Sequence, residues 1–266
     1  MVVLHVSPHP DDECMGAPAT LLALRDAGAR IVNYACGLGR PADHERRRAE
    51  LVEACRRGGL ELRIADPPLA LSRGDDLVAA ERELTSRLAS LCRALHPAIV
   101  VSSSPHDGHH AHELVGRAVR DALAGSGTAW WMWGIWADLP FPTLLTAFDA
   151  ERLEELQHVL AAHAGEQARI DVARLLRARA EATASLATER VFGSGETSDP
   201  ELAYAELLCE AIPGERGWRL GTPRRLDPKA PLCSPSGSGS DPIGPRQIGW
   251  WLEAESVHHR FRRISR

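Results

Sequence analysis

The stretch Met1–Glu13, MVVLHVSPHPDDE, decides the fold, because an apolar strand runs directly into one histidine and three carboxylates. In open α/β sheets, ligands bind at the carboxyl ends of the strands. A histidine and two aspartates within four residues (His9, Asp11 and Asp12) can share one small cation and leave one carboxylate for proton transfer. The stretch therefore predicts a metal site after the first strand. On its own, the same run also fits an acidic turn that caps the next helix.

A second strand, Ala98–Ser102, is followed by a complementary set of side chains. The run DGHHAH over residues 107–112 supplies one aspartate and three histidines. Taken alone, an exposed histidine cluster at a helix start would explain it. Two strands that end in complementary ligand sets are hard to explain by chance, so we predict that the two runs meet around one ion.

The residues of the two runs suggest distinct roles in hydrolysis. We predict His9, Asp12 and His112 as metal ligands, because two imidazoles and one carboxylate form an open set that leaves a position for water. In a tight turn, Asp11 would reach that water and act as general base. His109, one turn before His112, would as an imidazolium stabilise the oxyanion and then protonate the leaving amine.

Alternating strand and helix patterns predict an α/β fold with a Rossmann-like, doubly wound, mostly parallel sheet and helices on both faces. No GxGxxG follows the first strand, which argues against a dinucleotide-binding enzyme. The predicted strands are Val2–Val6, Arg30–Ala35, Leu60–Ala65, Ala98–Ser102 and Ala129–Trp133. The predicted helices are Met15–Ala27, His44–Gly58, Leu77–Leu95 and His112–Leu123.

The pattern changes in the second half of the chain. Asp149 is predicted to cap a helix that runs to His163, and a second helix covers Gln167–Arg190. We predict a core over residues 1–190 and, in the same domain, a loop-rich part over residues 191–266. The Ser-, Gly- and Pro-rich residues 227–245 suggest a flexible lid, and residues 247–263 suggest a final strand at a sheet edge.

Four tryptophans, Trp130, Trp131, Trp133 and Trp136, lie within seven residues. Aromatic faces stack on sugars and aryl groups, so we predict a substrate-binding role for them. The alternative is core packing, because alternation along a strand would bury at least half of these side chains.

Length and composition narrow the class of protein. With 266 residues, 44% of them hydrophobic and 25% charged, the chain fits one large globular domain or a domain with a modest extension. The net charge of −5 argues against a nucleic-acid partner. The N-terminus lacks the basic and long apolar regions of a signal peptide, and we expect no membrane span and a cytoplasmic location. Six scattered cysteines without a CxxC pair are expected to be reduced thiols, and nothing in the sequence indicates the oligomeric state.

The two motifs resemble those of the PIG-L/LmbE-like family of zinc-dependent N-acetylglucosaminyl deacetylases, (P/A)HPDDE and D-x-H-P-D-H. The first stands intact here as residues 8–13, and the second stands as residues 107–112 with two departures. His110 replaces the family's proline, and Ala111 replaces the aspartate that orients the catalytic histidine. Asp107 or a residue from elsewhere would have to take the place of that aspartate.

The resemblance covers roughly residues 1–190 and implies Zn²⁺, or another divalent transition metal, held by His9, Asp12 and His112. It places the general base on Asp11 and the oxyanion-stabilising histidine on His109. His163 matches a family position where a histidine precedes a glutamine near the pocket, which implies either a substrate-binding role or a role in supporting the residues that line the site. The rest of the sequence most resembles the deacetylases of glycopeptide-antibiotic biosynthesis, which act on pseudoaglycones of the teicoplanin and A40926 type.

The expected function is removal of the N-acetyl group from an N-acetylglucosaminyl unit of a glycosylated small molecule or glycopeptide. One alternative is a deacetylase of a small pseudo-disaccharide of the thiol-precursor type. Another is a non-hydrolytic carbohydrate-binding or glycosyl-transfer module, which would need no carboxylate beside the ligand set. A metallophosphoesterase is disfavoured, because such enzymes commonly use two metals and the sequence offers ligands for one.

Overall fold

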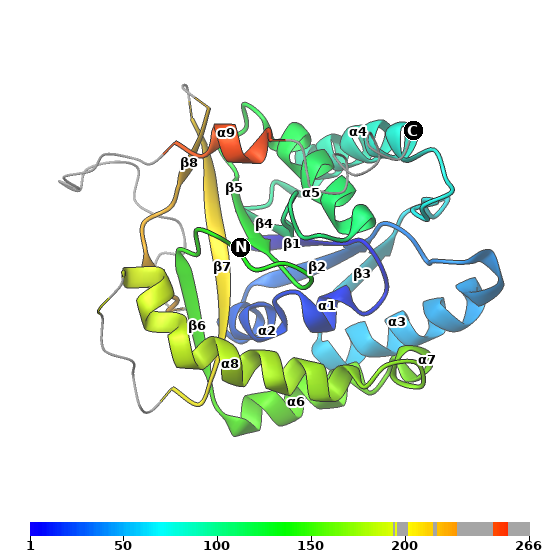
Figure 1. The fold of residues 1–266 in the computed structure, drawn as a ribbon. Coiled ribbons are helices and arrows are strands. Elements are labelled where there is room, and N and C mark those ends of the chain that lie inside the picture. Colours follow the sequence, from blue (N-terminus) through cyan, green and yellow to red (C-terminus); the bar gives the residue numbers. More distant parts are fainter. Residues whose placement is uncertain (194, 196–201, 215–216, 228–246, 255–266) are drawn as a thin grey trace, which may run out of the picture.

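A nine-stranded sheet with helices on both faces forms the fold in the part of the chain that the structure describes (Figure 1). The structure is a computed structural model, and it describes residues 1–193, 195, 202–214, 217–227 and 247–254. The strand order is β3-β2-β1-β4-β5-β7-β6-β9, and β8 pairs with β7. The strands are β1 (Val2–Ser7), β2 (Arg30–Ala35), β3 (Glu61–Ile64), β4 (Ile99–Ser103), β5 (Ala129–Trp133), β6 (Leu144–Phe148), β7 (Tyr204–Gly214), β8 (Gly217–Leu220) and β9 (Arg224–Arg225).

The five strands that the sequence predicts form the parallel part of this sheet, as expected. Strand β1 pairs in parallel with β2 and β4, and the outer pairs β2–β3 and β4–β5 are also parallel. Parallel strands of this kind are buried on both faces and therefore read as continuous apolar runs. The predicted α/β class and the mostly parallel, Rossmann-like layout are confirmed.

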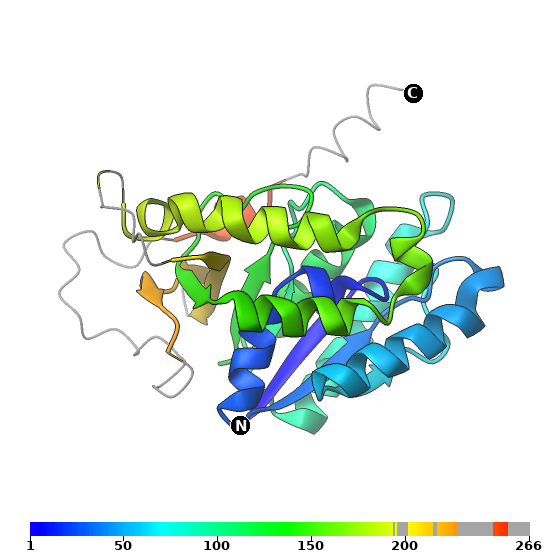
Figure 2. The same ribbon diagram turned by 90° about the horizontal axis from the view of Figure 1, so that it is seen from below.

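Two hydrophobic cores lie on the two faces of the sheet, because successive strand side chains point to opposite sides. Val3 packs on one face and Leu4 on the other. Figures 1 and 2 show that helices cover both faces, and the core residues divide these helices into two groups. The first group is α4 (Leu77–Leu95) and α5 (His110–Leu123), and the second is α2 (Pro18–Asp26), α3 (His44–Gly58), α6 (Ala150–Leu160) and α8 (Val172–Phe192).

The second half of the chain completes the sheet with strands that the sequence analysis did not predict. Strand β7 inserts between β5 and β6 and runs antiparallel to both. Its partners lie some 60 to 80 residues away, for example Trp130 opposite Ala211 and Leu144 opposite Leu208. Such pairing leaves no mark in the local sequence, so alternation alone did not reveal it.

Several predicted element boundaries are wrong for identifiable reasons. The predicted helix Met15–Ala27 is broken into α1 (Asp12–Met15) and α2, where Pro18 stands at the first helical position. The predicted helix from Gln167 is likewise divided, into α7 (Ala164–Gln167) and α8. The side chain of Asp171 accepts a hydrogen bond from the Arg174 N–H and thereby caps the new start.

The C-terminal predictions fare differently. In the described part, the predicted strand over residues 247–263 is wrong, because Gln247 makes a single antiparallel bridge with Arg219 and is followed by helix α9 (Gly249–Leu252). The other residues of that stretch, from 255 on, lie outside the described residues. So does the predicted lid at 227–245, apart from Asp227. No helix among the described residues is both long and apolar enough to cross a membrane.

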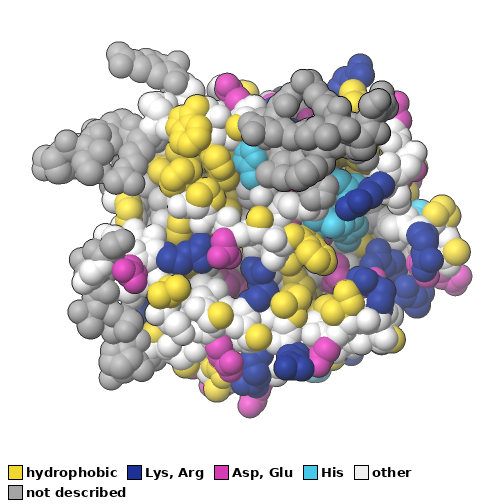
Figure 3. Space-filling view, in the orientation of Figure 1, with side chains coloured by type: hydrophobic (Ala, Val, Ile, Leu, Met, Phe, Trp, Pro, Cys, Tyr) yellow, Lys and Arg dark blue, Asp and Glu magenta, His cyan; other side chains and the backbone are white. Residues whose placement is uncertain are grey.

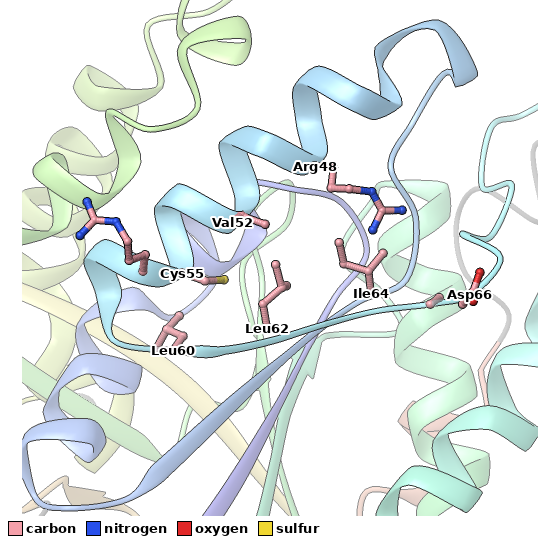
Figure 4. A pocket seen from close by; sticks show the side chains of 9 residues that line it. Arg48, Val52, Cys55, Leu60, Leu62, Ile64 and Asp66 are labelled. Atoms are coloured by element: carbon pink, nitrogen blue, oxygen red, sulfur yellow. The ribbon is translucent and has the colours of Figure 1, made fainter.

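One large groove of the described structure lies away from the predicted site residues. It has a volume of about 760 Å³ between α3 and the edge strand β3. Figure 4 shows that Val52 and Cys55 of α3 face Leu60, Leu62 and Ile64 across it. None of the predicted metal-binding or catalytic residues lines this groove.

Candidate active site

The carboxyl ends of β1 and β4 bring the two predicted motifs together. Because β1 and β4 are parallel neighbours, the turn after each strand emerges at the same edge of the sheet. The His9 Nδ1 lies 3.3 Å from one oxygen of Asp12, and the His112 Nε2 lies 3.4 Å from the other. The predicted ligand triad therefore converges. Figure 3 shows histidine side chains reaching the surface on this face, next to apolar side chains.

The turn that holds the first motif is unusual in its backbone. Asp11 has φ 106° and ψ −21°, in the left-handed region that side chains other than glycine rarely adopt. Two side chains of the same turn stabilise it. The Asp12 carboxylate accepts a hydrogen bond from the His9 N–H at 2.7 Å, and the Glu13 carboxylate accepts one from the Asp11 N–H at 3.1 Å. This is the tight turn that the adjacent carboxylates of the sequence required.

His112 is oriented by Asp107, a contact that the sequence analysis did not assign. The Asp107 Oδ2 lies 2.7 Å from the His112 Nδ1, which leaves the Nε2 of that ring directed at Asp12. Asp107 is fully buried, and its other oxygen accepts the N–H groups of Ile135 and Trp136. Asp107 therefore does not replace the missing aspartate beside His109. The signal in the sequence that could have predicted this contact was the position of Asp107, five residues before the proposed ligand His112.

His109 lies in the histidine cluster but has no acidic partner. Its ring centroid is 4.7 Å from that of His112 and 5.1 Å from that of His9. Its buried Nδ1 has no hydrogen-bond partner among the described residues, and Ala111 is itself buried in α5. Burial, followed by the nearby His112, His9 and His110, lowers the pKa of His109 to about 3. The structure thus favours a neutral His109 over the predicted imidazolium.

The two aspartates of the turn have opposite electrostatic environments. Burial and the neighbouring carboxylates Asp12 and Glu13 raise the pKa of Asp11 well above its usual value. For Asp12, burial acts in the same direction, but His112 and His9 outweigh it and lower its pKa. Asp12 is therefore the carboxylate suited to a cation, and Asp11 the one suited to accepting a proton. Arg47, which opposes the shift at Asp11, is a nearby cation that the sequence analysis missed.

The donor atoms at this edge can hold one divalent ion. Nitrogen atoms of His9, His109 and His112 all lie within 4.8 Å of one another, and Asp12 adds its carboxylate to two of these rings. Imidazole nitrogen and carboxylate oxygen are the donors that Zn²⁺ and related ions accept.

Comparison with known proteins adds the family. Residues 4–123, which contain every side chain of this cluster, match the family described as "PIG-L: GlcNAc-PI de-N-acetylase". This similarity covers 120 of the chain's 266 residues, a region named the PIG-L domain after the family that it resembles. The rest of the described chain adds the antiparallel strands and the helices that surround that domain.

A curated relative and two solved structures are similar to the chain. The relative is a probable N-acetyl-alpha-D-glucosaminyl L-malate deacetylase 2 of Bacillus cereus, 32% identical over an alignment of 141 residues that covers 46% of this chain. The match spans 60% of that relative's length, less than two thirds. The structure of the A40926 pseudoaglycone deacetylase Dbv21 superposes with a TM-score of 0.63 at 18% identity, covering 77% of this chain and 95% of that one.

The second structure is described as the zinc inhibited form of teicoplanin deacetylase Orf2. It superposes with a TM-score of 0.61 at 15% identity and covers 81% of this chain and 99% of that one. At these identities the two structures establish the shared α/β fold. Because they cover 77% and 81% of this chain, the shared fold includes more of the chain than residues 4–123.

Three of the four tryptophans beside the PIG-L domain are core residues, contrary to the predicted substrate-binding role. Trp130, Trp131 and Trp133 are fully buried in β5, and each indole N–H has an internal acceptor. Central strands are covered on both faces, so both sets of alternating side chains are enclosed. Trp136, after the end of β5, is 63% exposed and stacks on His109 at a centroid distance of 5.8 Å. It is the one of the four that can meet a substrate.

His163 is also buried, and the predicted contact with substrate is wrong for it. Its Nε2 lies 2.5 Å from the Glu13 Oε1, and both side chains are enclosed. Burial lowers the pKa of His163, but Glu13 outweighs this and raises it, while His163 likewise lowers the pKa of Glu13 against the effect of burial. Each group therefore favours the charged form of the other, and the pair lies directly behind the turn of the first motif.

Proposed function

We propose that this chain is a metal-dependent hydrolase that removes the N-acetyl group from an N-acetylglucosaminyl unit and releases acetate and a free amine. The supporting observation is the convergence of His9, Asp12 and His112 beside Asp11 at the carboxyl edge of a PIG-L domain. A binding module would need no carboxylate with a raised pKa next to a cation site.

The ligand residues fit a divalent transition metal. His9, Asp12 and His112 would hold the ion. The Asp107 carboxylate accepts a hydrogen bond from the His112 Nδ1, and this supports the ligand set because it directs the His112 Nε2 toward Asp12. We propose Zn²⁺, although the same donors accept other divalent transition metals. When bound, the ion supplies Lewis-acid activation of a water molecule and of the amide carbonyl.

The chain's own residues supply the proton transfers. Asp11 takes the proton of the attacking water as the oxygen bonds to the amide carbon. When the C–N bond breaks, the same carboxyl delivers that proton to the leaving nitrogen, so that a neutral amine and acetic acid result, and the acid then loses its proton to solvent as acetate. His109, uncharged with its low pKa, donates a neutral N–H hydrogen bond to the carbonyl oxygen as negative charge develops there.

For the substrate, we propose a glycopeptide pseudoaglycone that carries an N-acylated glucosamine, modified during antibiotic biosynthesis. The exposed ring of Trp136 beside His109 supports a substrate with a sugar or aryl face next to the scissile amide. Similarity in fold to the two pseudoaglycone deacetylases agrees with this proposal. The alternative is a small N-acetylglucosaminyl glycoside, which the sequence relative from Bacillus cereus favours.

A substrate panel tests the proposal. The purified, metal-loaded chain is incubated with N-acetylglucosamine, with N-acetylglucosaminyl malate and with an N-acetylated glycopeptide pseudoaglycone, and acetate and mass loss are measured. A kcat/KM at least about tenfold higher for the glycopeptide than for the malate glycoside supports the proposal, and the reverse order supports the alternative. Binding of a glycan without acetate release from any substrate would identify a non-hydrolytic module.

A further inference from the structure

The buried pair of Glu13 and His163 has no role in the proton transfers described above, yet it touches the turn that carries them. Glu13 uses both of its oxygens, since Oε1 contacts the His163 Nε2 at 2.5 Å and Oε2 accepts the Asp11 N–H at 3.1 Å. His163 precedes α7 and lies 150 positions from Glu13 in the chain. The second half of the molecule therefore reaches the backbone of Asp11 through one carboxylate.

That backbone needs a restraint. A residue other than glycine in the left-handed region costs roughly 1 kcal/mol or more and persists only when its surroundings hold it there. The Asp11 C=O is fixed by the Cys14 N–H at 2.8 Å, and its N–H by the Glu13 carboxylate. The direction of the Asp11 side chain follows from this backbone conformation, so a rotation of Glu13 would change where the carboxylate points.

His163 itself is held firmly. Its backbone N–H bonds to the Leu160 C=O at 3.0 Å, which ties it to the end of α6. The Gly165 N–H that follows donates to Glu50 of α3 at 2.9 Å. The imidazole thus projects from a fixed corner between α6 and α3, and it can hold the Glu13 carboxylate in one rotamer.

We propose that His163 is a positioning residue for Asp11, acting through Glu13. The imidazole holds the Glu13 carboxylate, which holds the Asp11 N–H and thereby keeps Asp11 in the left-handed conformation that aims its carboxylate at the scissile amide. This inference rests on the proposed function only for the role of Asp11. Glu13, Cys14 and His163 could also be considered as a cation site, but an ion would have to separate a pair already 2.5 Å apart.

The kinetic test compares His163→Leu with His163→Gln, whose side-chain amide can still donate to Glu13. His158→Leu, which replaces an exposed histidine of the preceding helix α6, is the matched control. We expect His163→Leu to lower kcat about 10- to 100-fold, because small misplacements of a reacting group are costly, while KM and bound metal stay within about twofold. His163→Gln should recover part of kcat. A wild-type kcat in a folded His163→Leu protein, or no difference between Leu and Gln, would overturn the proposal.

A double-mutant cycle separates this role from general damage. If His163 acts through Asp11, then His163→Leu should cost less than about twofold when added to Asp11→Asn. A full multiplicative loss in the double variant would mean that His163 acts elsewhere.

Amide hydrogen exchange tests the contact without any substrate. The exchange of the Asp11 N–H should be at least about tenfold faster in His163→Leu than in the wild type, and nearly unchanged in His158→Leu. Unchanged protection of Asp11 in His163→Leu would sink the inference even if the chain is an active deacetylase. Lost protection in a chain without deacetylase activity would leave the positioning contact standing and overturn only the proposed function. If His163→Leu does not fold, His163→Gln carries the same comparison with a smaller expected change.

Discussion

The two halves of the sheet contribute different things to the candidate site. The parallel half, residues 1–133 with strands β1 to β5, holds the proposed ligands and both proposed catalytic side chains, all within two short runs at strand ends. The described residues of the second half contribute no ligand of the cluster, yet they contact the first half through His163 and through the loop after β5. The proposed site residues thus come from short local motifs, whereas their orientation depends on contacts between distant segments of the chain.

The loop of residues 134–139 receives hydrogen bonds from both halves of the molecule. Asp107 binds its backbone N–H groups from one side. From the other side Arg179 of α8 donates to the carbonyls of Gly134 and Ile135, and Arg190 donates to that of Leu139. The exposed Trp136 therefore stands on a loop that is fastened by both halves. Four predictions test whether substitutions in the first half change catalysis and metal binding and whether substitutions in the second half change substrate binding and stability.

The largest effect is expected from Asp11→Asn, a change within the parallel half. The amide cannot accept a proton from water, so kcat should fall by about 10²- to 10⁴-fold. Bound metal, measured by elemental analysis, should stay the same, because Asp11 is not among the proposed ligands. Activity within tenfold of the wild type would remove Asp11 from its proposed role.

A smaller effect is expected from Asp107→Asn, which alters the residue shared by both halves. The asparagine would offer an N–H to the His112 Nδ1 and so favour the tautomer whose Nε2 carries a proton and cannot bind a cation. Metal affinity, measured by competition with a chelator, should fall about 10- to 100-fold. Full kcat should return at saturating metal. An unchanged affinity would mean that this hydrogen bond does not control the ligand.

Trp136→Ala tests the contribution of the loop to substrate binding. Loss of an aromatic stacking surface worth about 1 kcal/mol should raise KM for the preferred glycosylated substrate roughly five- to tenfold, with kcat nearly constant. Trp250→Ala is the matched control, because Trp250 is similarly exposed, at 67%, but its ring contacts Phe141 edge-to-face and not His109. Equal KM values for Trp136→Ala and the wild type would exclude a role for this ring.

Glu206→Gln should affect stability rather than catalysis. Glu206 of β7 accepts the Ala19 and Thr20 N–H groups at the start of α2, and burial raises its pKa to about 7. Because its pKa is lower in the unfolded chain, the folded wild type should lose stability as pH rises from about 4.5 to 7.

The glutamine variant should lack that component of the pH dependence. Its free energy of unfolding should match the wild type near pH 4, where Glu206 is protonated, and exceed it at pH 8 by at most roughly 3 kcal/mol. Denaturant unfolding at several pH values measures both. Parallel curves for the two proteins would show that the carboxylate is not strained by burial, and kcat should be the same in both.

Much of the parallel half could be predicted from the sequence. The bounds of β2 and β5 coincide with the predicted strands, and α3 and α4 begin and end where the periodicity predicts. The convergence of His9 with His112 followed from two motifs at the ends of neighbouring parallel strands. Each of these inferences uses signals within about twenty residues, which is the range over which hydrophobic periodicity and capping act.

The wrong predictions for the tryptophans and for His163 share one cause, because each depends on a partner distant in the sequence. Trp130 and Trp131 have the composition of a sugar-binding surface, and only the insertion of β7 beside β5 encloses them. His163 gave no sign that it would meet Glu13, and Asp107 was equally placed in sequence to serve His109 or His112.

The sequence by itself determined the parallel strands, the helices between them and the two polar runs, because backbone periodicity and strand-end chemistry are local. Only the tertiary structure decided which tryptophan is exposed, which histidine has an acidic partner and what restrains Asp11. Burial and hydrogen-bond pairing depend on segments up to 150 positions apart, and no local pattern of side chains specifies which of them will meet.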